Sequence, residues 1–319
     1  MSPDPRDALR NAVTAAILTP FDASGTAHVD AVGPYAASLV SDGVAALAVL
    51  AHTGRGLHLS DDVRRAVVRT VRDSVDVPLI AGIGLPTYGN DEPSEVERRL
   101  VQAGVEMAAS GADALMIYPV ARDAHPDIAG LHASVARASG LPVVAFVLYE
   151  AASGHRYSVD LARRLVATEG VLGIKTAVLD DAMTCQDLIT GCRAERPGTI
   201  VFTGEDRMLG PSLMWGADAA LVGIAAALPR LTVDLVDAWT RQRHADFVTA
   251  SGLVDALAAL TFKAPMDTYV QRMAWLAAWE GRLPAGLCHD PVSAPASPNE
   301  RRELIAAVAE IVGAVPAGR

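Results

Sequence analysis

Lysine is almost absent from this chain. The chain has 319 residues and 27 basic side chains, yet only two of these, Lys175 and Lys263, are lysines. Arginine therefore supplies positive charge nearly everywhere. Arginine keeps its proton across the accessible pH range, so it cannot perform chemistry that needs a neutral amine. Each of the two lysines is consequently a candidate for a specific role.

Cationic charge, cysteine and long apolar runs are also scarce. The net charge of −10 argues against binding to a nucleic-acid backbone, which requires clustered cations. The three cysteines form no C-x-x-C pair, so no disulfide framework is expected. Apolar stretches are interrupted well before the ~18 residues of a membrane span, and the first residues are polar. A soluble cytoplasmic protein is the expectation.

Several catalytic motifs are missing. The eight histidines show neither H-x-H nor H-E-x-x-H spacing, so neither a metal site nor a cofactor is expected. No G-x-S-x-G turn is present, which removes the nucleophile elbow of the hydrolases. A doubly wound sheet is the alternative architecture, but no G-x-G-x-x-G follows the first apolar run.

Short apolar runs alternate with amphipathic helical patterns along the chain. This alternation predicts an α/β fold, a (β/α)8 TIM barrel. We expect an N-terminal tail over residues 1–11, the barrel over 12–229 and a C-terminal helical extension packed on the barrel over 230–319. The eight expected strands cover residues 13–18, 44–50, 77–81, 114–117, 142–148, 171–174, 199–202 and 219–222.

In such a barrel the active site lies at the C-terminal ends of the strands. Lys175 directly follows the sixth apolar run. Desolvation beside a barrel interior lowers the pKa of an ammonium, and a neutral amine can form an imine with a ketone. The alternative is a lysine that reaches the rim or pairs with an acid such as Glu205. Lys263 follows a helical pattern, where a surface or helix-terminal role is expected.

Other polar residues follow other apolar runs. Tyr149 can move protons at an imine or can be a core tyrosine that caps a carbonyl, and Tyr118 has a similar position. Thr53 and Gly54 precede a helix, where N–H groups can hold a carboxylate. His52 is either an acid or base or a structural histidine. The acidic groups Asp61-Asp62, Asp180-Asp181 and Glu205-Asp206 are interpreted as solvated or capping.

Eight short segments stand in a characteristic order along the chain: Leu18-Thr19-Pro20-Phe21, Thr53-Gly54, Ala81-Gly82-x-Gly84, Gly111-Ala112-Asp113, Tyr118-Pro119, Leu148-Tyr149, Gly173-Ile174-Lys175 and Thr203-Gly204-Glu205-Asp206. G-I-K after an apolar run, with L-Y 26 residues earlier, is the most specific combination. Taken in order, these segments resemble the dihydrodipicolinate synthase / N-acetylneuraminate lyase family. The resemblance implies a TIM barrel with C-terminal helices, usually a homotetramer, and a Schiff base between the lysine and pyruvate or another 2-keto acid.

The resemblance also assigns roles to residues. It makes Lys175 the Schiff-base lysine, Tyr149 the proton-transferring tyrosine and Thr53-Gly54 the carboxylate-binding loop. Further contacts to substrate are expected near the strand ends. The residues concerned are His52, Arg55, Tyr118, Gly204, Glu205 and Leu221.

The loops depart from the family pattern. Where members carry G-T-T-G-E or G-S-T-G-E, this chain has His52 in place of the first hydroxyl residue and Arg55 in place of the acid. Val120 follows Tyr118-Pro119, so a second tyrosine of the synthases is missing. Their substrate-binding arginine is matched by Arg156 only if the loop is shifted. The residues that would form the imine therefore match the family pattern, whereas the residues that would select the second substrate differ from it.

These departures favour an aldolase or retro-aldolase acting on pyruvate or a longer 2-keto acid, and not the lysine-pathway synthase. His52 and Arg55 are expected to contact the substrate beyond C3. One alternative is a 2-keto-3-deoxy sugar-acid dehydratase that uses the same lysine, and another is a non-catalytic keto-acid-binding descendant. A phosphate-binding barrel is disfavoured because Glu205 and Asp206 would repel phosphate. The expected partners are a small 2-keto acid and further copies of the chain in a homotetramer or homodimer, with no nucleic acid or membrane.

Overall fold

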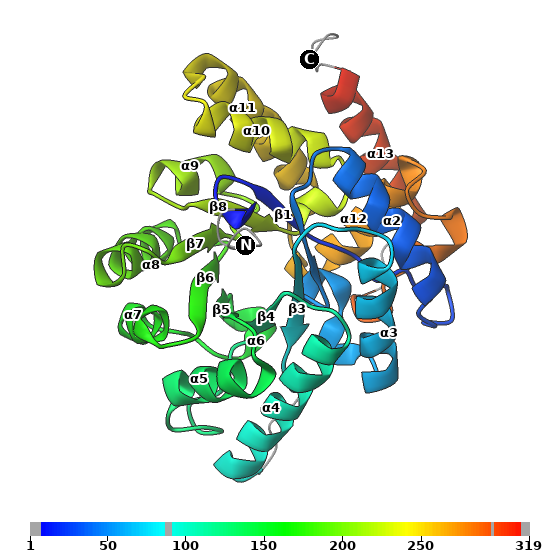
Figure 1. Cartoon of the computed structure of the whole chain (residues 1–319). Coiled ribbons are helices and arrows are strands. Elements are labelled where there is room, and N and C mark those ends of the chain that lie inside the picture. Colours follow the sequence, from blue (N-terminus) through cyan, green and yellow to red (C-terminus); the bar gives the residue numbers. More distant parts are fainter. Residues whose placement is uncertain (1–7, 87–90, 295–296, 314–319) are drawn as a thin grey trace.

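The computed structural model describes residues 8–86, 91–294 and 297–313. Eight parallel strands close into a barrel in which each strand pairs with the next along the chain and β8 pairs with β1 (Figure 1). The predicted TIM barrel is confirmed. The strands are β1 (Val13–Ala16), β2 (Ala46–Val49), β3 (Leu79–Ile83), β4 (Ala114–Ile117), β5 (Val143–Leu148), β6 (Val171–Ala177), β7 (Ile200–Thr203) and β8 (Ala219–Val222).

Helices connect the strands and cover the outside of the barrel (Figure 1). The start of α3 shows how the sequence sets a boundary: the Ser60 hydroxyl accepts the N–H of Val63, and Asp61 and Asp62 occupy the first turn, where carboxylates favour the helix dipole. The connecting helices are α2 (Val32–Ser41), α3 (Asp61–Arg72), α4 (Pro93–Ala109), α5 (Ile128–Ser139), α6 (Glu150–Ser153), α7 (Val159–Ala167), α8 (Ala182–Glu195) and α9 (Leu209–Met214).

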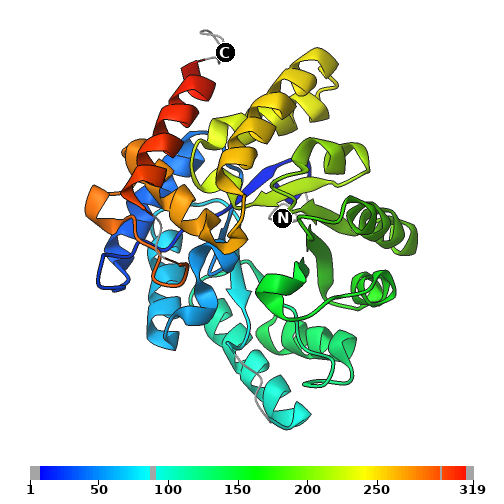
Figure 2. The ribbon, with the colours of Figure 1, turned by 180° about the vertical axis from the view of Figure 1, so that it is seen from behind.

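After β8 the chain is helical. Both views show these helices gathered on the side of the barrel where β8 and β1 meet (Figures 1 and 2). The helix α10 contacts β1 and the turn after β8, and α12 contacts that turn. A short turn, η5, precedes α12 and brings its residues toward the barrel mouth. The elements are α10 (Pro229–Thr240), α11 (His244–Thr261), η5 (Met266–Thr268), α12 (Tyr269–Trp279) and α13 (Pro298–Gly313).

Two apolar layers form the core. One fills the barrel interior and the other packs between the barrel and its helices. Along β2 the two sets alternate: Ala46 and Ala48 face the interior, whereas Leu47 and Val49 face the helices. This alternation follows from the period of two in a strand, and it decides which side chains can reach a site inside the barrel.

Strand β6 is longer than the sequence predicts. The apolar run ends at Ile174, but the hydrogen-bonded register continues to Ala177. Lys175 therefore lies within the strand and not just after it. Its neighbours in register are Phe146 on β5 and Phe202 on β7. Both belong to the interior layer, so the lysine side chain points into the barrel.

No single described helix has the length and apolar character needed to cross a lipid bilayer. The helix α11 and the segment Met266–Trp279 meet that criterion only together, as a pair bent by 112°.

Candidate active site

Lys175 is buried in an aromatic environment. Only 5% of the residue is exposed, and its Nζ lies 4.4 Å from the ring centroid of Phe146. Burial lowers the pKa of Lys175, while the charges of Asp206 and Glu205 oppose that shift. The net direction is downward, so more of the amine is neutral near physiological pH than in a solvated lysine. A neutral amine is the form that attacks a carbonyl carbon.

Gly204 provides the space that the lysine needs. A Cβ at this position would lie 2.4 Å from Cε of Lys175 and 2.7 Å from the carbonyl oxygen of Thr176. The N–H of Gly204 donates to that same carbonyl at 2.6 Å. The backbone after β7 therefore approaches β6 closely, and only glycine fits beside the lysine stem.

Glu205 and Asp206 are buried and not solvated. They are 0% and 6% exposed, so of the two interpretations of this pair, solvated or capping, the solvated one is wrong. The carboxylate of Glu205 accepts the N–H groups of Val178 and Leu179 at 2.8 and 2.7 Å, and Asp206 accepts that of Ile224 at 2.7 Å. Burial raises the pKa of both carboxyl groups. The pair holds two loops at the barrel mouth, and its charges act on the pKa of Lys175.

Tyr149 begins the turn after β5, and its N–H donates to the carbonyl of Ala177 at 2.8 Å. Its hydroxyl is buried and has no hydrogen-bond partner among the described residues. Burial, reinforced by the charge of Asp267, raises the pKa of Tyr149. The phenol therefore keeps its proton and presents an unused donor in the cavity of Lys175.

Thr53 lies in the turn η2 (His52–Gly54) after β2. Its hydroxyl oxygen and the phenol oxygen of Tyr269 are 2.9 Å apart. Gly223 packs against the same hydroxyl, because a Cβ at this position would lie 2.9 Å from Oγ1 of Thr53. Thr19 fixes the turn by donating to the carbonyl of Gly54 at 2.7 Å.

Lys175, Tyr149, Thr53 and Gly204 line one small cavity. The open space is about 20 Å³, little more than one water molecule needs, so side chains must shift when a ligand enters. In the part of the chain that the structure describes, no group of three His, Cys, Asp or Glu side chains is arranged to hold a metal ion. The cavity is lined by His52, Thr53, Phe146, Leu148, Tyr149, Lys175, Ala177, Leu179, Gly204, Asp206, Gly223, Phe262 and Tyr269.

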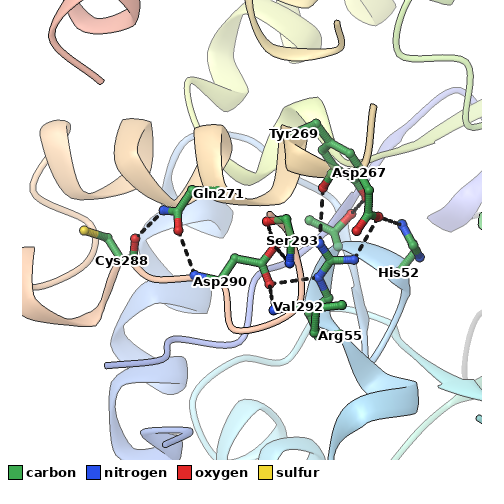
Figure 3. A network of polar contacts seen from close by, with 10 residues as sticks. His52, Arg55, Asp267, Tyr269, Gln271, Cys288, Asp290, Val292 and Ser293 are labelled. Carbon is green, nitrogen blue, oxygen red and sulfur yellow. Dashed lines mark hydrogen bonds and ion pairs between the residues drawn. The ribbon is translucent and has the colours of Figure 1, made fainter. Parts of the chain in front are cut away.

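His52 is paired with an acid from the C-terminal extension (Figure 3). Its Nε2 lies 2.7 Å from Oδ1 of Asp267, a residue of η5. Burial tends to raise the pKa of Asp267, but hydrogen bonds from His52 and Arg55 outweigh it and hold that pKa well below its usual range. Burial lowers the pKa of His52, more than the hydrogen bond to Asp267 raises it.

Arg55 is 2% exposed and points toward Asp267 and Asp290 (Figure 3). Its guanidinium donates to both carboxylate oxygens of Asp290, at 3.0 and 2.5 Å, and to Oδ1 of Asp267 at 2.9 Å. The side chain of Asp290 is fully buried. These carboxylates occupy most of the guanidinium donors, so Arg55 ties the turn after β2 to the C-terminal extension.

Three further candidates lie outside the lysine cavity. The hydroxyl of Tyr118 donates to the carbonyl of Leu50 at 3.1 Å. Leu221 is fully buried in the interior layer. Arg156 is exposed and donates to Asp181 at 2.8 Å. Leu221 thus belongs to the packed barrel interior, whereas Tyr118 lines a neighbouring cavity and Arg156 is at the surface beside another.

Two larger cavities flank the turn after β5. Each has a volume of about 330 Å³. One contains Tyr149, Arg156 and three carboxylates, namely Glu150, Asp180 and Asp181. The other shares His52 and Leu148 with the lysine cavity and is lined by His52, Arg55, Leu57, His58, Leu85, Pro86, Tyr118, Pro119, Leu148, Ala152, Ser153 and His155.

Reasoning from strand ends missed Asp267 and Tyr269. Both come from the start of α12 and the turn before it, a region expected only to pack on the barrel. The available signal was weak: a carboxylate and a phenol close together between two largely apolar helical patterns.

Comparison with known proteins gives a consistent result. The chain matches the Dihydrodipicolinate synthetase family over residues 9–311. It is 28% identical to the 4-hydroxy-tetrahydrodipicolinate synthase of Methanothrix thermoacetophila, covering 93% of this chain and 97% of the relative. It is 30% identical to the enzyme of that name from Bifidobacterium longum, covering 81% and 80%. YjhH of Escherichia coli, a probable 2-dehydro-3-deoxy-D-pentonate aldolase, is 26% identical, covering 79% and 81%.

Solved structures share the architecture. YagE, a prophage protein of the dihydrodipicolinic acid synthase family from Escherichia coli solved in complex with pyruvate, has a TM-score of 0.81 at 20% identity and covers 94% of this chain and 98% of that chain. A dihydrodipicolinate synthase variant described as monomeric has a TM-score of 0.81 at 20% identity, covering 98% and 99%. At these identities the likeness shows the fold.

Proposed function

Because the chain belongs to the dihydrodipicolinate synthetase family, whose members are lyases, we propose that it forms or cleaves the C3–C4 bond of a 2-keto acid through a Schiff base on Lys175. The observation that carries this proposal is the buried Lys175 with its lowered pKa, in one cavity with Tyr149 and Thr53. Lys175 is the one lysine of two that is buried, since Lys263 is exposed.

In the proposed reaction, Thr53 and the backbone beside it bind the substrate carboxylate. Lys175 attacks the 2-keto carbon, and Tyr149 donates a proton to the oxygen that leaves as water. The resulting protonated imine accepts the electron pair of the C3–C4 bond when that bond breaks. Burial supports this role for Tyr149, because a raised pKa keeps the phenol protonated until it is needed.

The residues around the Lys175 cavity fit an aldol reaction outside lysine biosynthesis better than they fit the synthase reaction. Relatives include 4-hydroxy-tetrahydrodipicolinate synthases and a probable 2-dehydro-3-deoxy-D-pentonate aldolase. An acceptor with its own carboxylate needs a free cation near the cavity. Here Arg55 is held by Asp267 and Asp290, and Arg156 is paired with Asp181. The proposed acceptor is therefore a neutral aldehyde.

Reductive trapping tests the proposal. Wild-type protein is incubated with pyruvate and sodium cyanoborohydride, and its intact mass is measured. We expect one adduct per chain, located at Lys175 by peptide mapping. Lys175→Arg keeps the charge and should lose the adduct, whereas Lys263→Arg is the matched control and should keep it. If pyruvate and longer 2-keto acids leave the wild-type mass unchanged, the Schiff-base proposal is wrong.

Product analysis separates the alternatives. With a 2-keto-3-deoxy sugar acid, released pyruvate indicates cleavage, and a product that retains the carbon skeleton indicates the dehydratase. An adduct without turnover of any substrate supports the keto-acid-binding descendant. We further propose a homotetramer or homodimer in the cytoplasm. Light scattering tests that assembly against the monomeric state described for one structural relative.

A further inference from the structure

The His52–Asp267 pair has a defined protonation pattern. Asp267 carries its charge because hydrogen bonds from His52 and Arg55 overcome the effect of burial on its pKa. An ionised carboxylate can only accept hydrogen bonds. Nε2 of His52, 2.7 Å from Oδ1 of Asp267, therefore carries the proton of the neutral imidazole. Nδ1 is left with a lone pair that can accept a proton.

His52 lies at the boundary between two cavities. It lines the small cavity of Lys175 and also the adjoining cavity of about 330 Å³. Its ring meets that of Tyr149 edge to face, with centroids 6.1 Å apart. The lysine cavity adjoins this larger cavity through His52 and Leu148, and it adjoins the cavity that contains Arg156 through Leu148 and Tyr149. A 2-keto acid joined to Lys175 at C2 that extends past His52 into the larger cavity has C3 and C4 beside the imidazole.

The geometry points to a role in proton transfer, which rests on the function proposed above. We propose that His52 is the base that carries a proton between the C4 oxygen and C3 of the imine-bound substrate. Asp267 is the positioning residue that fixes the tautomer of His52 from the C-terminal extension.

His52 takes up one proton and returns it within one cleavage reaction. Nδ1 of His52 takes the proton of the C4 hydroxyl as the C3–C4 bond breaks. The electron pair of that bond becomes the C2–C3 double bond of an enamine, and C4 leaves as an aldehyde carbonyl. The imidazolium then returns its proton to C3, which becomes the methyl group of the pyruvate imine. Condensation follows the same steps in reverse, and no other reactant is needed.

The charged groups around His52 leave its imidazole able to act as a base. Asp267 stabilises the imidazolium, while Arg55 and Lys175 oppose it, and the phenols of Tyr149 and Tyr269 face the ring from other elements. Burial is the largest effect and leaves the pKa of His52 below its usual value. The imidazole is consequently neutral at physiological pH. A positioned base of this kind contributes typically about 10²–10⁴ in rate.

Exchange of the methyl hydrogens of pyruvate for deuterium isolates this step. The exchange requires the imine and then removal of a proton from C3, so no acceptor aldehyde is needed. Wild-type protein in D2O should exchange the methyl signal in proton NMR spectra. His52→Asn should slow that exchange by about 100-fold or more, yet keep the cyanoborohydride adduct of pyruvate at Lys175.

His28→Asn is the matched control. His28 forms the same type of pair, with Nε2 2.8 Å from Oδ2 of Asp22, but it lines neither cavity. This variant should exchange and trap as wild type does. His52→Gln is a second replacement, so that a folding defect of one variant, seen in its thermal unfolding, does not decide the result.

Variants of Asp267 test the positioning role. Asp267→Asn removes the charge that stabilises the imidazolium, so the pH at which exchange reaches half its maximum should move down and the maximal rate should fall by about 10-fold. Asp267→Glu restores a carboxylate and should recover the pH profile in part. A residue with only a structural role would lower the rate without moving the profile.

The outcomes separate the two proposals. A wild-type protein that forms no adduct overturns both. A wild-type protein that forms the adduct but does not exchange, or a His52→Asn variant that exchanges at the wild-type rate, overturns the His52 assignment alone. An unchanged pH profile in Asp267→Asn overturns the positioning role of Asp267.

Discussion

Gly204 lies so close to Lys175 that a methyl group on the glycine would come within 2.4 Å of Cε. Its other near neighbour, the carbonyl of Thr176, is backbone, so little can yield except the lysine. Gly204→Ala should therefore displace the amine and slow formation of the pyruvate adduct by at least about 10-fold, the effect of a small misplacement of a reacting group.

The control for this change is Gly198→Ala. A Cβ at Gly198 meets nothing within 4 Å, so this variant should trap pyruvate as wild type does. Equal trapping rates for the two alanine variants would contradict the steric argument.

Adduct formation should depend on pH through Lys175. Burial lowers the pKa of this lysine and Asp206 opposes that effect, so the rate should rise with pH and level off below the usual lysine range. Asp206→Asn removes the opposing charge and should move the midpoint down by about one pH unit. The control is Asp187→Asn, on the exposed face of α8, which should leave the midpoint in place. A midpoint that is unchanged in Asp206→Asn would show that Asp206 does not act on Lys175.

Arg55 should matter for stability. Arg55→Met leaves the buried carboxylate of Asp290 without its cation, and removing one partner of a buried pair costs about 3–5 kcal/mol. Urea unfolding measures the loss. The double variant Arg55→Met/Asp290→Asn should recover part of it, because both charges are gone.

Arg98→Met is the comparison for Arg55, because Arg98 forms a pair with Glu95 at the surface of α4. Its urea midpoint should match that of wild type. A midpoint for Arg55→Met equal to that of Arg98→Met would show that the buried pair contributes nothing.

The contact between Tyr269 and Thr53 should affect binding more than chemistry. Tyr269→Phe removes the hydroxyl 2.9 Å from the Thr53 hydroxyl, which then loses its fixed orientation. The pyruvate concentration for half-maximal trapping should rise about 10-fold, the effect of roughly one lost hydrogen bond, while the maximal rate changes little.

Tyr35→Phe serves as the control for that variant. The hydroxyl of Tyr35 donates to the carbonyl of Ala226 outside the lysine cavity. This change should lower the melting temperature and leave half-saturation unaltered. If the pyruvate concentration for half-maximal trapping is the same in Tyr269→Phe as in wild type, Thr53 has no role in binding the carboxylate.

The barrel can be predicted from the sequence because each strand is marked by its own residues. Apolar runs mark buried strands, and the ranges 114–117 and 219–222 coincide with β4 and β8. The end of β6 is misplaced because Lys175 and Thr176 interrupt the apolar pattern while the backbone ladder continues. Propensity reports side-chain character, whereas a strand boundary depends on backbone pairing with neighbours.

The site is predicted in part for the same reason. Lys175 and Tyr149 follow apolar runs and are found in one cavity. Asp267, the partner of His52, lies 215 positions further along the chain, and no local sequence pattern predicts such a contact. The burial of Glu205 depends on two backbone N–H groups of another loop, so its sequence neighbours do not reveal it.

The C-terminal extension has a consequence for biosynthesis. The last barrel strand ends at Val222, whereas the partners of His52 and Thr53 are residues 267 and 269. On a ribosome all eight strands therefore emerge before either partner does. A nascent chain that has released all eight strands contains the lysine but still lacks the residues that anchor the loop after β2. Translation that stops short of Asp267 yields a polypeptide that carries the nucleophile without its complete surroundings.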